Sequence, residues 1–263
     1  MPAEIALGVA NLSADVRVFA DLDALCHAAA LEFVSASQNA RSEHGRFLVS
    51  FSGGATPGRL YDLSSLAPYG DQIDWAAVQA FWGDERCVPP NDAQSNYRQV
   101  FDLLLSKVPV RPENIHRIRA ELGPEEAADD YGRVLKTYSV PPLDWPRFDL
   151  ALLGLGADGH IASLFPGSDV DASRPVMPAS RHYGDRPAAR VTLTPRVFNS
   201  ARKVMFLVSG SEKAGILADV LYGEYRPAAL PAQRIRPTEG QSTWLVDRAA
   251  AARLPGHEVA NKE

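Results

Sequence analysis

The chain has 263 residues, of which 46% are apolar and 22% charged, and its formal net charge is −5. A chain of this size and apolar content can bury a large core, which excludes disordered and collagen-like classes and predicts one α/β domain over residues 1–263, with frayed ends at 1–15 and 255–263. The negative charge and the lack of a basic run argue against nucleic-acid binding.

Cysteine usage and hydropathy predict the compartment. Cys26 and Cys87 lie far apart with no CxxC spacing, which argues against a disulfide framework and a thiolate zinc site. The N-terminus has no cationic stretch ahead of a long apolar run, and no segment approaches about 18 uninterrupted apolar residues. We therefore expect a cytoplasmic protein with no export signal, no membrane span and no membrane partner.

The first half of the chain alternates apolar runs with segments of helical periodicity. Strands are predicted at 16–20, 46–51 and 78–82, and helices at 21–41, 58–66, 95–105 and 125–138. Thr56 is the expected N-cap of the second helix, with Pro57 in the first turn, where proline is tolerated. The segment 83–86 is predicted to be a loop.

The second half continues the alternation. Strands are predicted at 148–153, 191–194, 204–208 and 243–246, with a helix at 211–222 and a loop at 165–175. Residues 148–153 are almost continuously apolar, as a buried parallel strand requires. Strands interleaved with helices predict a doubly wound, mostly parallel, Rossmann-like sheet with helices on both faces.

In such sheets ligands bind beyond the carboxyl ends of the strands. The first notable loop there is Ser52-Gly53-Gly54, which follows a strand and opens a helix. Its glycines let backbone N–H groups approach an anion at a helix N-terminus, which suits a phosphate or a sugar hydroxyl. An ordinary tight turn between strand and helix is the alternative.

The second loop, at 83–86, places Asp84, Glu85 and Arg86 directly after a buried strand. Arg86 is a candidate to hold a carboxylate or phosphate bidentately, or to stabilise a developing oxyanion, and Asp84 is a candidate substrate contact. A solvated loop is the competing interpretation.

The third loop, GLGADGH at 154–160, formally matches GxGxxG. The dinucleotide interpretation fails on context, because residues 165–175 form a loop rather than a strand ending in an acidic residue. Asp158 and His160 lie two apart in a glycine-rich turn, where a carboxylate can orient an imidazole that exchanges protons near neutral pH. A structural histidine is the alternative.

The fourth loop, SGSEK at 209–213, places Lys213 in the first turn of a helix, where a cation is unfavourable unless an anion offsets it. A bound phosphate would do so, and an exposed surface lysine is the alternative. Arg190 heads the strand at 191–194 and is a weaker candidate of the same kind. The other histidines show no partner spacing and are interpreted as structural or surface residues: His27, His44, His116, His182 and His257.

Several familiar chemistries lack their motifs. The sequence contains no GxSxG elbow, no HExxH and no GxxxxGK[ST] loop, which argues against a serine-hydrolase triad, a dedicated zinc site and a P-loop. What remains is acid/base chemistry on an anionic ligand, with no metal and no cofactor expected.

Six collinear segments between about Arg46 and Ala250 resemble the 6-phosphogluconolactonase family: SFSGGATP, FWGDERCVPPNDAQSNY, FDLALLGLGADGHIASLFPG, RVTLT, FLVSGSEKA and PAQRIRP. The resemblance implies a fold shared with glucosamine-6-phosphate deaminases and isomerases. It also implies hydrolysis of 6-phospho-D-glucono-1,5-lactone, a phosphosugar, to 6-phospho-D-gluconate in the oxidative pentose phosphate pathway, by a monomer or small homo-oligomer.

The resemblance and the residues together suggest roles. His160 would activate water and then protonate the departing ring oxygen, Asp158 would orient it, and Arg86 would stabilise the oxyanion. The phosphate and hydroxyls would be held by Ser52, Gly53, Gly54, Arg190 and Lys213.

Two rivals stay open. The deaminases resemble this chain around His160 but carry a glutamate five residues beyond it, where this chain has Phe165, and tend to show Asp-Glu-Tyr in place of Asp84-Glu85-Arg86. The other rival is a non-catalytic sugar-phosphate sensor, which would usually need a DNA-binding module that this chain lacks.

Overall fold

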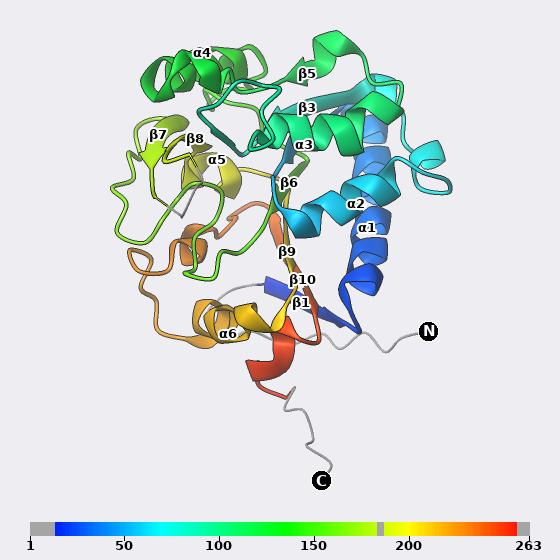
Figure 1. Ribbon diagram of the computed structural model, residues 1–263. Helices are drawn as coiled ribbons and strands as arrows, with labels where there is room; N and C mark the ends of the chain where they lie inside the picture. The colour runs from blue at the N-terminus through cyan, green and yellow to red at the C-terminus, as the bar shows by residue number, and fades with distance from the viewer. Residues whose placement is uncertain (1–13, 183–186, 257–263) are drawn as a thin grey trace.

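The structure is a computed structural model, which describes residues 14–182 and 187–256 (Figure 1). The strands are Ala14–Phe19 (β1), Phe47–Phe51 (β2), Val78–Trp82 (β3), Asp84–Arg86 (β4), Ile115–His116 (β5), Leu150–Leu153 (β6), Val176–Ser180 (β7), Ala189–Leu193 (β8), Lys203–Val208 (β9) and Gln241–Asp247 (β10). The α-helices are Leu22–His44 (α1), Ala55–Ser64 (α2), Asn96–Leu103 (α3), Pro124–Thr137 (α4), Pro195–Asn199 (α5) and Ala214–Tyr222 (α6). Short 3₁₀ helices are Gly70–Gln72 (η1), Trp75–Ala77 (η2), Leu105–Lys107 (η3), Pro112–Asn114 (η4), Ala120–Leu122 (η5), Ser211–Lys213 (η6), Pro231–Arg234 (η7) and Ala250–Arg253 (η8).

The main sheet has seven strands in the order β1-β10-β9-β6-β2-β3-β5, and its neighbours pair in parallel. Figure 1 shows α1 and α2 on one side of this sheet, with α5 and α6 on the other. All residues of β2 and β6 are buried, as expected for parallel strands that are covered on both faces of the sheet. The predicted doubly wound sheet is confirmed.

Local signals set the ends of the first helix. The carboxylate of Asp21 accepts a hydrogen bond from the Ala24 N–H, which satisfies one of the free donors at the start of α1. Gly45 ends the helix in a left-handed conformation, with a φ of 79°. Phe33, on the buried face of α1, packs edge-on against Phe47 of β2 at 5.2 Å between ring centroids and so joins this helix to the sheet.

A second sheet, antiparallel and in the order β4-β8-β7, was not predicted. The segment 83–86, expected as a loop, forms β4, and the strand predicted at 191–194 is β8 of this sheet rather than part of the parallel one. In the register of the sheet Arg86 pairs with Arg190. The prediction was wrong because so short a strand exists only through a partner about a hundred residues away in the chain.

Helix starts also differ from the prediction. Gly54, not Thr56, is the N-cap of α2, so that Thr56 lies within the first turn. Ser95 caps α3 by accepting from the Arg98 N–H at 3.1 Å. The helix predicted at 211–222 begins as η6 and continues as α6, while β5, β7 and α5 were not predicted.

The histidines outside the third loop have varied surroundings. Three of them contact side chains: His27 lies 2.8 Å from Tyr69 Oη, His44 contacts Asp149, and His116 contacts Gln79. His182 is exposed. His257 and most of both expected frayed ends lie outside the described residues. Within residues 14–182 and 187–256, no helix combines the length and apolarity needed to cross a membrane.

Candidate active site

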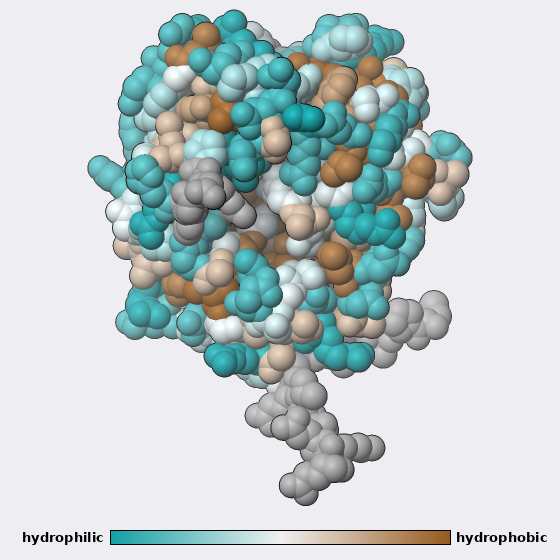
Figure 2. All heavy atoms as spheres, in the orientation of Figure 1, coloured by the Kyte–Doolittle hydropathy of each residue, from teal (hydrophilic) through white to brown (hydrophobic). Residues whose placement is uncertain are grey.

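The carboxyl ends of β2, β3, β6 and β9 open onto one cavity of about 690 Å³. Figure 2 shows it as a hollow near the middle of the molecular face. All nine residues proposed from the sequence line it: Ser52, Gly53, Gly54, Asp84, Arg86, Asp158, His160, Arg190 and Lys213. These side chains come from segments up to 161 residues apart, and the parallel sheet brings them together because its strands end at the same edge.

The glycine loop after β2 is held by a buried phenol. Tyr61 Oη accepts from the Ser52 N–H at 3.0 Å and donates to the Ser52 carbonyl at 2.6 Å. Burial raises the pKa of Tyr61, so the hydroxyl stays protonated and able to donate. A Cβ on Gly53 would lie 1.9 Å from Asn96 Oδ1, and thus only glycine fits there. The loop then opens α2, whose first N–H groups have no partner within the helix.

His160 and Asp158 face one another in the turn after β6. The turn closes through bonds from the Gly156 N–H to the His160 carbonyl and from the Gly159 N–H to the Gly156 carbonyl. Asp158 Oδ1 lies 2.5 Å from His160 Nδ1 and also accepts from the His160 N–H at 3.2 Å. Because Nδ1–H donates to this carboxylate, Nε2 is the ring atom that can accept a proton.

Space around the imidazole is provided by glycine. A Cβ on Gly156 would lie 2.0 Å from His160 Nδ1, so any other residue would displace the ring. The Phe165 ring also packs against the imidazole of His160, with 5.1 Å between the two ring centroids. The side chains of His160 and Asp158 remain 26% and 30% exposed, which leaves room for a water at the ring.

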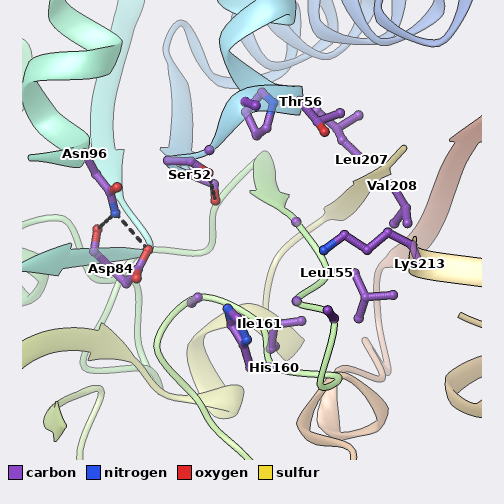
Figure 3. A pocket seen from close by; sticks show the side chains of 18 of the residues that line it. Ser52, Thr56, Asp84, Asn96, Leu155, His160, Ile161, Leu207, Val208 and Lys213 are labelled. Carbon is purple, nitrogen blue, oxygen red and sulfur yellow. Dashed lines mark hydrogen bonds between the residues drawn. The ribbon is translucent and has the colours of Figure 1, made fainter. Parts of the chain in front are cut away.

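Asp84 is a buried carboxylate with both oxygens engaged. Oδ1 accepts from Asn96 Nδ2 at 3.1 Å, as Figure 3 shows. Oδ2 accepts from Ser163 Oγ at 2.6 Å. The residue is 5% exposed. These bonds fix the orientation of the Asp84 carboxylate at the wall of the cavity.

Three cations surround the cavity. Arg86 donates from Nη1 to the Gln94 carbonyl at 2.6 Å, and the buried guanidinium of Arg190 lies 5.6 Å from the Phe165 ring centroid. In Figure 3 the Lys213 side chain extends from the end of η6 across the cavity. Positive side chains around a hollow attract an anionic ligand and hold it by charge-assisted hydrogen bonds.

Sequence reasoning missed the residues that support this lining. Glu85 is 2% exposed, and its carboxylate accepts from the N–H groups of Arg86, Asn96 and Tyr97 and from Ser95 Oγ. Burial raises the pKa of Glu85, while those four bonds oppose the shift. Glu85 therefore ties β4 to the start of α3. Asn96 and Ser163 lie inside two of the family segments, but nothing else in the sequence indicated a role for them. Their roles depend on contacts with residues that are distant in the chain.

No three histidine, cysteine, aspartate or glutamate side chains gather as a metal site would need in the part of the chain that the structure describes. The two cysteines are unpaired, and burial raises the pKa of Cys26 to about 12 and that of Cys87 to about 11. Neither thiol is activated as a nucleophile.

Comparison with known proteins identifies the family. Residues 20–244 match the family model described as glucosamine-6-phosphate isomerases/6-phosphogluconolactonase. The chain belongs to this family. A relative named 6-phosphogluconolactonase from Mycobacterium leprae is 36% identical over 93% of this chain and all of its own length. Another of the same name, from Haemophilus influenzae, is 34% identical over 86% of this chain and 93% of its own length.

Solved structures of family members share the fold. A 6-phosphogluconolactonase from Trypanosoma brucei superposes with a TM-score of 0.80 at 27% identity and covers 94% of this chain and all of its own. A structure described as a monomeric glucosamine-6-phosphate deaminase has a TM-score of 0.77 at 18% identity, over 90% of this chain and 99% of its own, and shows the fold alone.

Proposed function

We propose that this chain hydrolyses 6-phospho-D-glucono-1,5-lactone to 6-phospho-D-gluconate in the oxidative pentose phosphate pathway. The observation that carries the proposal is the 2.5 Å contact between His160 and Asp158 in a cavity also lined by Arg86, Arg190 and Lys213. Family membership and the names of relatives that match over most of their length support the choice of substrate.

The chemistry follows from the arrangement of the turn. His160 Nε2 takes a proton from a water, whose oxygen attacks C1 of the lactone and converts the carbonyl to a tetrahedral oxyanion. The oxyanion then collapses, the bond from C1 to O5 breaks, and His160 returns its proton to O5. The products are the open-chain acid and a neutral imidazole. Asp158 keeps the ring in the tautomer that can accept a proton and stabilises the imidazolium in between.

Arg86 is the proposed oxyanion stabiliser, because it ends β4 beside the cavity and its planar guanidinium can direct several N–H donors at one oxygen anion. One such donor commonly contributes about 3 kcal/mol to the barrier reduction. The phosphate and sugar hydroxyls are assigned to the Ser52-Gly53-Gly54 loop, Arg190 and Lys213, and Asp84 to a hydroxyl. Ester hydrolysis of this kind transfers no electrons and so needs no redox cofactor, and the acid/base steps proposed here involve no metal.

We propose that the enzyme acts as a monomer or a small homo-oligomer. The two unpaired cysteines fit a reducing compartment, and we propose that the enzyme acts in the cytoplasm.

Two observations weigh against amino-sugar deamination. Phe165, 2% exposed, occupies the position at which the deaminases carry a further carboxylate, and both oxygens of Asp84 already accept hydrogen bonds. Opening an amino sugar and releasing ammonia needs additional groups that shuttle protons. The hydrolysis of an activated ester needs only one base and one oxyanion donor.

The deciding experiment measures acid release from freshly generated 6-phosphogluconolactone at constant pH, with and without protein. We expect release far above the spontaneous rate, with no ammonia formed from glucosamine 6-phosphate. Lactone opening at the buffer rate would overturn the proposal. If the protein then still bound 6-phosphogluconate, a sensor function would be indicated.

A further inference from the structure

A glutamine behind the glycine loop holds one residue of that loop by two hydrogen bonds. Gln99 Oε1 accepts from the Gly54 N–H at 2.9 Å, and Gln99 Nε2 donates to the Gly54 carbonyl at 2.8 Å. Gln99 lies on α3 and is not among the residues that line the cavity, whereas Gly54 is. The carboxamide therefore contacts the loop from behind.

Gly54 needs such support because glycine can adopt many backbone conformations. It has φ 119° and ψ 166°, which side-chain-bearing residues rarely adopt, and as the N-cap of α2 it has no side chain of its own to bond the free N–H groups of the helix. A glycine loop without restraint would sample many directions of its peptide groups, and ordering them on ligand binding would cost conformational entropy.

The direction of the next N–H group is set by the bonds to the Gly54 carbonyl, which accepts from Gln99 Nε2 at 2.8 Å and, within α2, from the Gly58 N–H at 3.2 Å. The Gly54 carbonyl and the Ala55 N–H belong to one planar trans peptide, in which they point in opposite directions. Since Gln99 Nε2 holds that carbonyl toward α3, the Ala55 N–H points away from α3. Ala55 lines the cavity, and this N–H is among the first of α2, which have no partner within the helix.

The helix that carries Gln99 is itself anchored. One turn earlier on α3, Asn96 lies against Gly53 and donates to Asp84, and its N–H donates to the buried Glu85 carboxylate at 2.7 Å. Residues three apart on a helix share a face, so Asn96 and Gln99 present one surface to the glycine loop. A Cβ on Gly58 would lie 3.1 Å from Gln99 Nε2, which shows how closely α2 and α3 pack there.

We propose that Gln99 is a positioning residue for the phosphate end of the substrate. It touches no substrate atom and acts by orienting the Ala55 N–H toward the anion. The inference rests on the proposed function for the identity of the anion, and it assigns to α3 a contribution to phosphate affinity and none to the chemical step.

The test is Gln99→Leu, which keeps the side-chain size but loses both hydrogen bonds. We expect KM for the phosphorylated lactone to rise roughly fivefold to tenfold, with kcat within about twofold of the wild type. The kcat/KM for the unphosphorylated glucono-1,5-lactone stays unchanged. Gln99→Glu raises KM further, because a carboxylate faces the Gly54 carbonyl and adds negative charge near the phosphate.

The matched control is Gln38→Leu. Gln38 also donates from its carboxamide to a backbone carbonyl, that of Gln72 at 3.3 Å, but it lies on α1 away from the cavity. Its KM and kcat should match the wild type. If Gln99→Leu weakened turnover of both lactones equally, or lowered kcat alone, Gln99 would be a general structural support and the inference would be overturned. An unchanged KM would overturn it as well.

A binding measurement separates this inference from the proposed function. The dissociation constant of inorganic phosphate, measured by titration calorimetry for the wild type and Gln99→Leu, requires no turnover. If the wild type had no lactonase activity but its affinity for phosphate fell in Gln99→Leu, the proposed function would be contradicted and the role of Gln99 would be supported. Equal phosphate affinity in the two proteins would contradict the role of Gln99 whatever the activity.

Discussion

His160 is positioned by its immediate neighbours. The carboxylate two residues before it selects the ring tautomer, and the absence of a side chain at Gly156 makes space for the ring. These constraints act within one short turn. The histidine side chain can therefore be removed without disturbing the strand that carries the turn.

We expect His160→Ala to lower kcat by roughly 10² to 10⁴-fold, because it removes the only proposed proton carrier. The variant should unfold at the same urea concentration as the wild type. Both rates need correction for spontaneous lactone opening. Turnover close to the wild-type value would exclude His160 from the mechanism.

Lys213 is expected to act on binding rather than on the chemical step. Lys213→Ala should raise KM for the phosphorylated lactone about tenfold and leave kcat little changed, because the proposed role of this half-buried cation is to bind the phosphate and not to act at the lactone carbonyl. Lys107→Ala, which removes a cation paired with Asp62 far from the cavity, is the control. An unchanged KM in Lys213→Ala would show that this ammonium group contributes nothing to phosphate binding.

At the scale of elements, the turn that carries His160 is braced by η7. The Ala232 N–H donates to the Gly159 carbonyl at 3.1 Å. The neighbouring Gln233 is 1% exposed; its Nε2 donates to carbonyls at the end of α6, and its Oε1 accepts from the Arg226 N–H at 2.7 Å. The late segment PAQRIRP thus joins α6 to the turn.

Gln233→Ala should lower the free energy of unfolding by about 2 to 3 kcal/mol, because it leaves a cavity and several buried backbone groups without partners. Urea denaturation measures this change. Gln94→Ala, at an exposed position, should change stability by less than about 0.5 kcal/mol. A loss in Gln233→Ala no larger than in that control would mean that water replaces the lost bonds.

At the scale of the whole molecule, a half-buried histidine couples stability to pH. His116 of β5 lies between Phe81 and Tyr138, each at 4.6 Å between ring centroids, and burial lowers its pKa to about 4. The unfolded chain binds a proton there below about pH 6.5, while the folded chain binds it only near pH 4. The contribution of His116 to the free energy of unfolding is fully present above about pH 6.5 and is lost as the pH falls toward about 4.

His116→Asn should remove that part of the pH dependence. Between about pH 7.5 and about pH 4.5 the wild type should lose on the order of 1 kcal/mol more stability than the variant, a figure reduced for the partial exposure of the ring. Urea midpoints at the two pH values measure the difference. Equal losses in both proteins would show that His116 titrates alike in the folded and unfolded states.

Most strands of the parallel sheet, the longer helices and nine of the cavity residues could be predicted from the sequence, because their signals are local. Apolar runs such as 148–153 and 204–208 mark buried strands, and loops rich in glycine after them mark the carboxyl edge. That the loops carrying His160, Arg86 and Lys213 lie at one edge of the sheet followed from the fold class. That residues 1–263 form a single domain stays a prediction.

The tertiary structure alone decided the small antiparallel sheet, the start of α2 at Gly54, and the support given by Asn96 and Gln99. A short strand such as β4 and a carboxamide such as Gln99 have no periodicity of their own and become defined only by partners distant in the chain. The sequence by itself therefore determined the fold class and nine of the residues that line the cavity, since strand burial and turn chemistry are local. How those residues are held depended on contacts between segments that only the folded chain brings together.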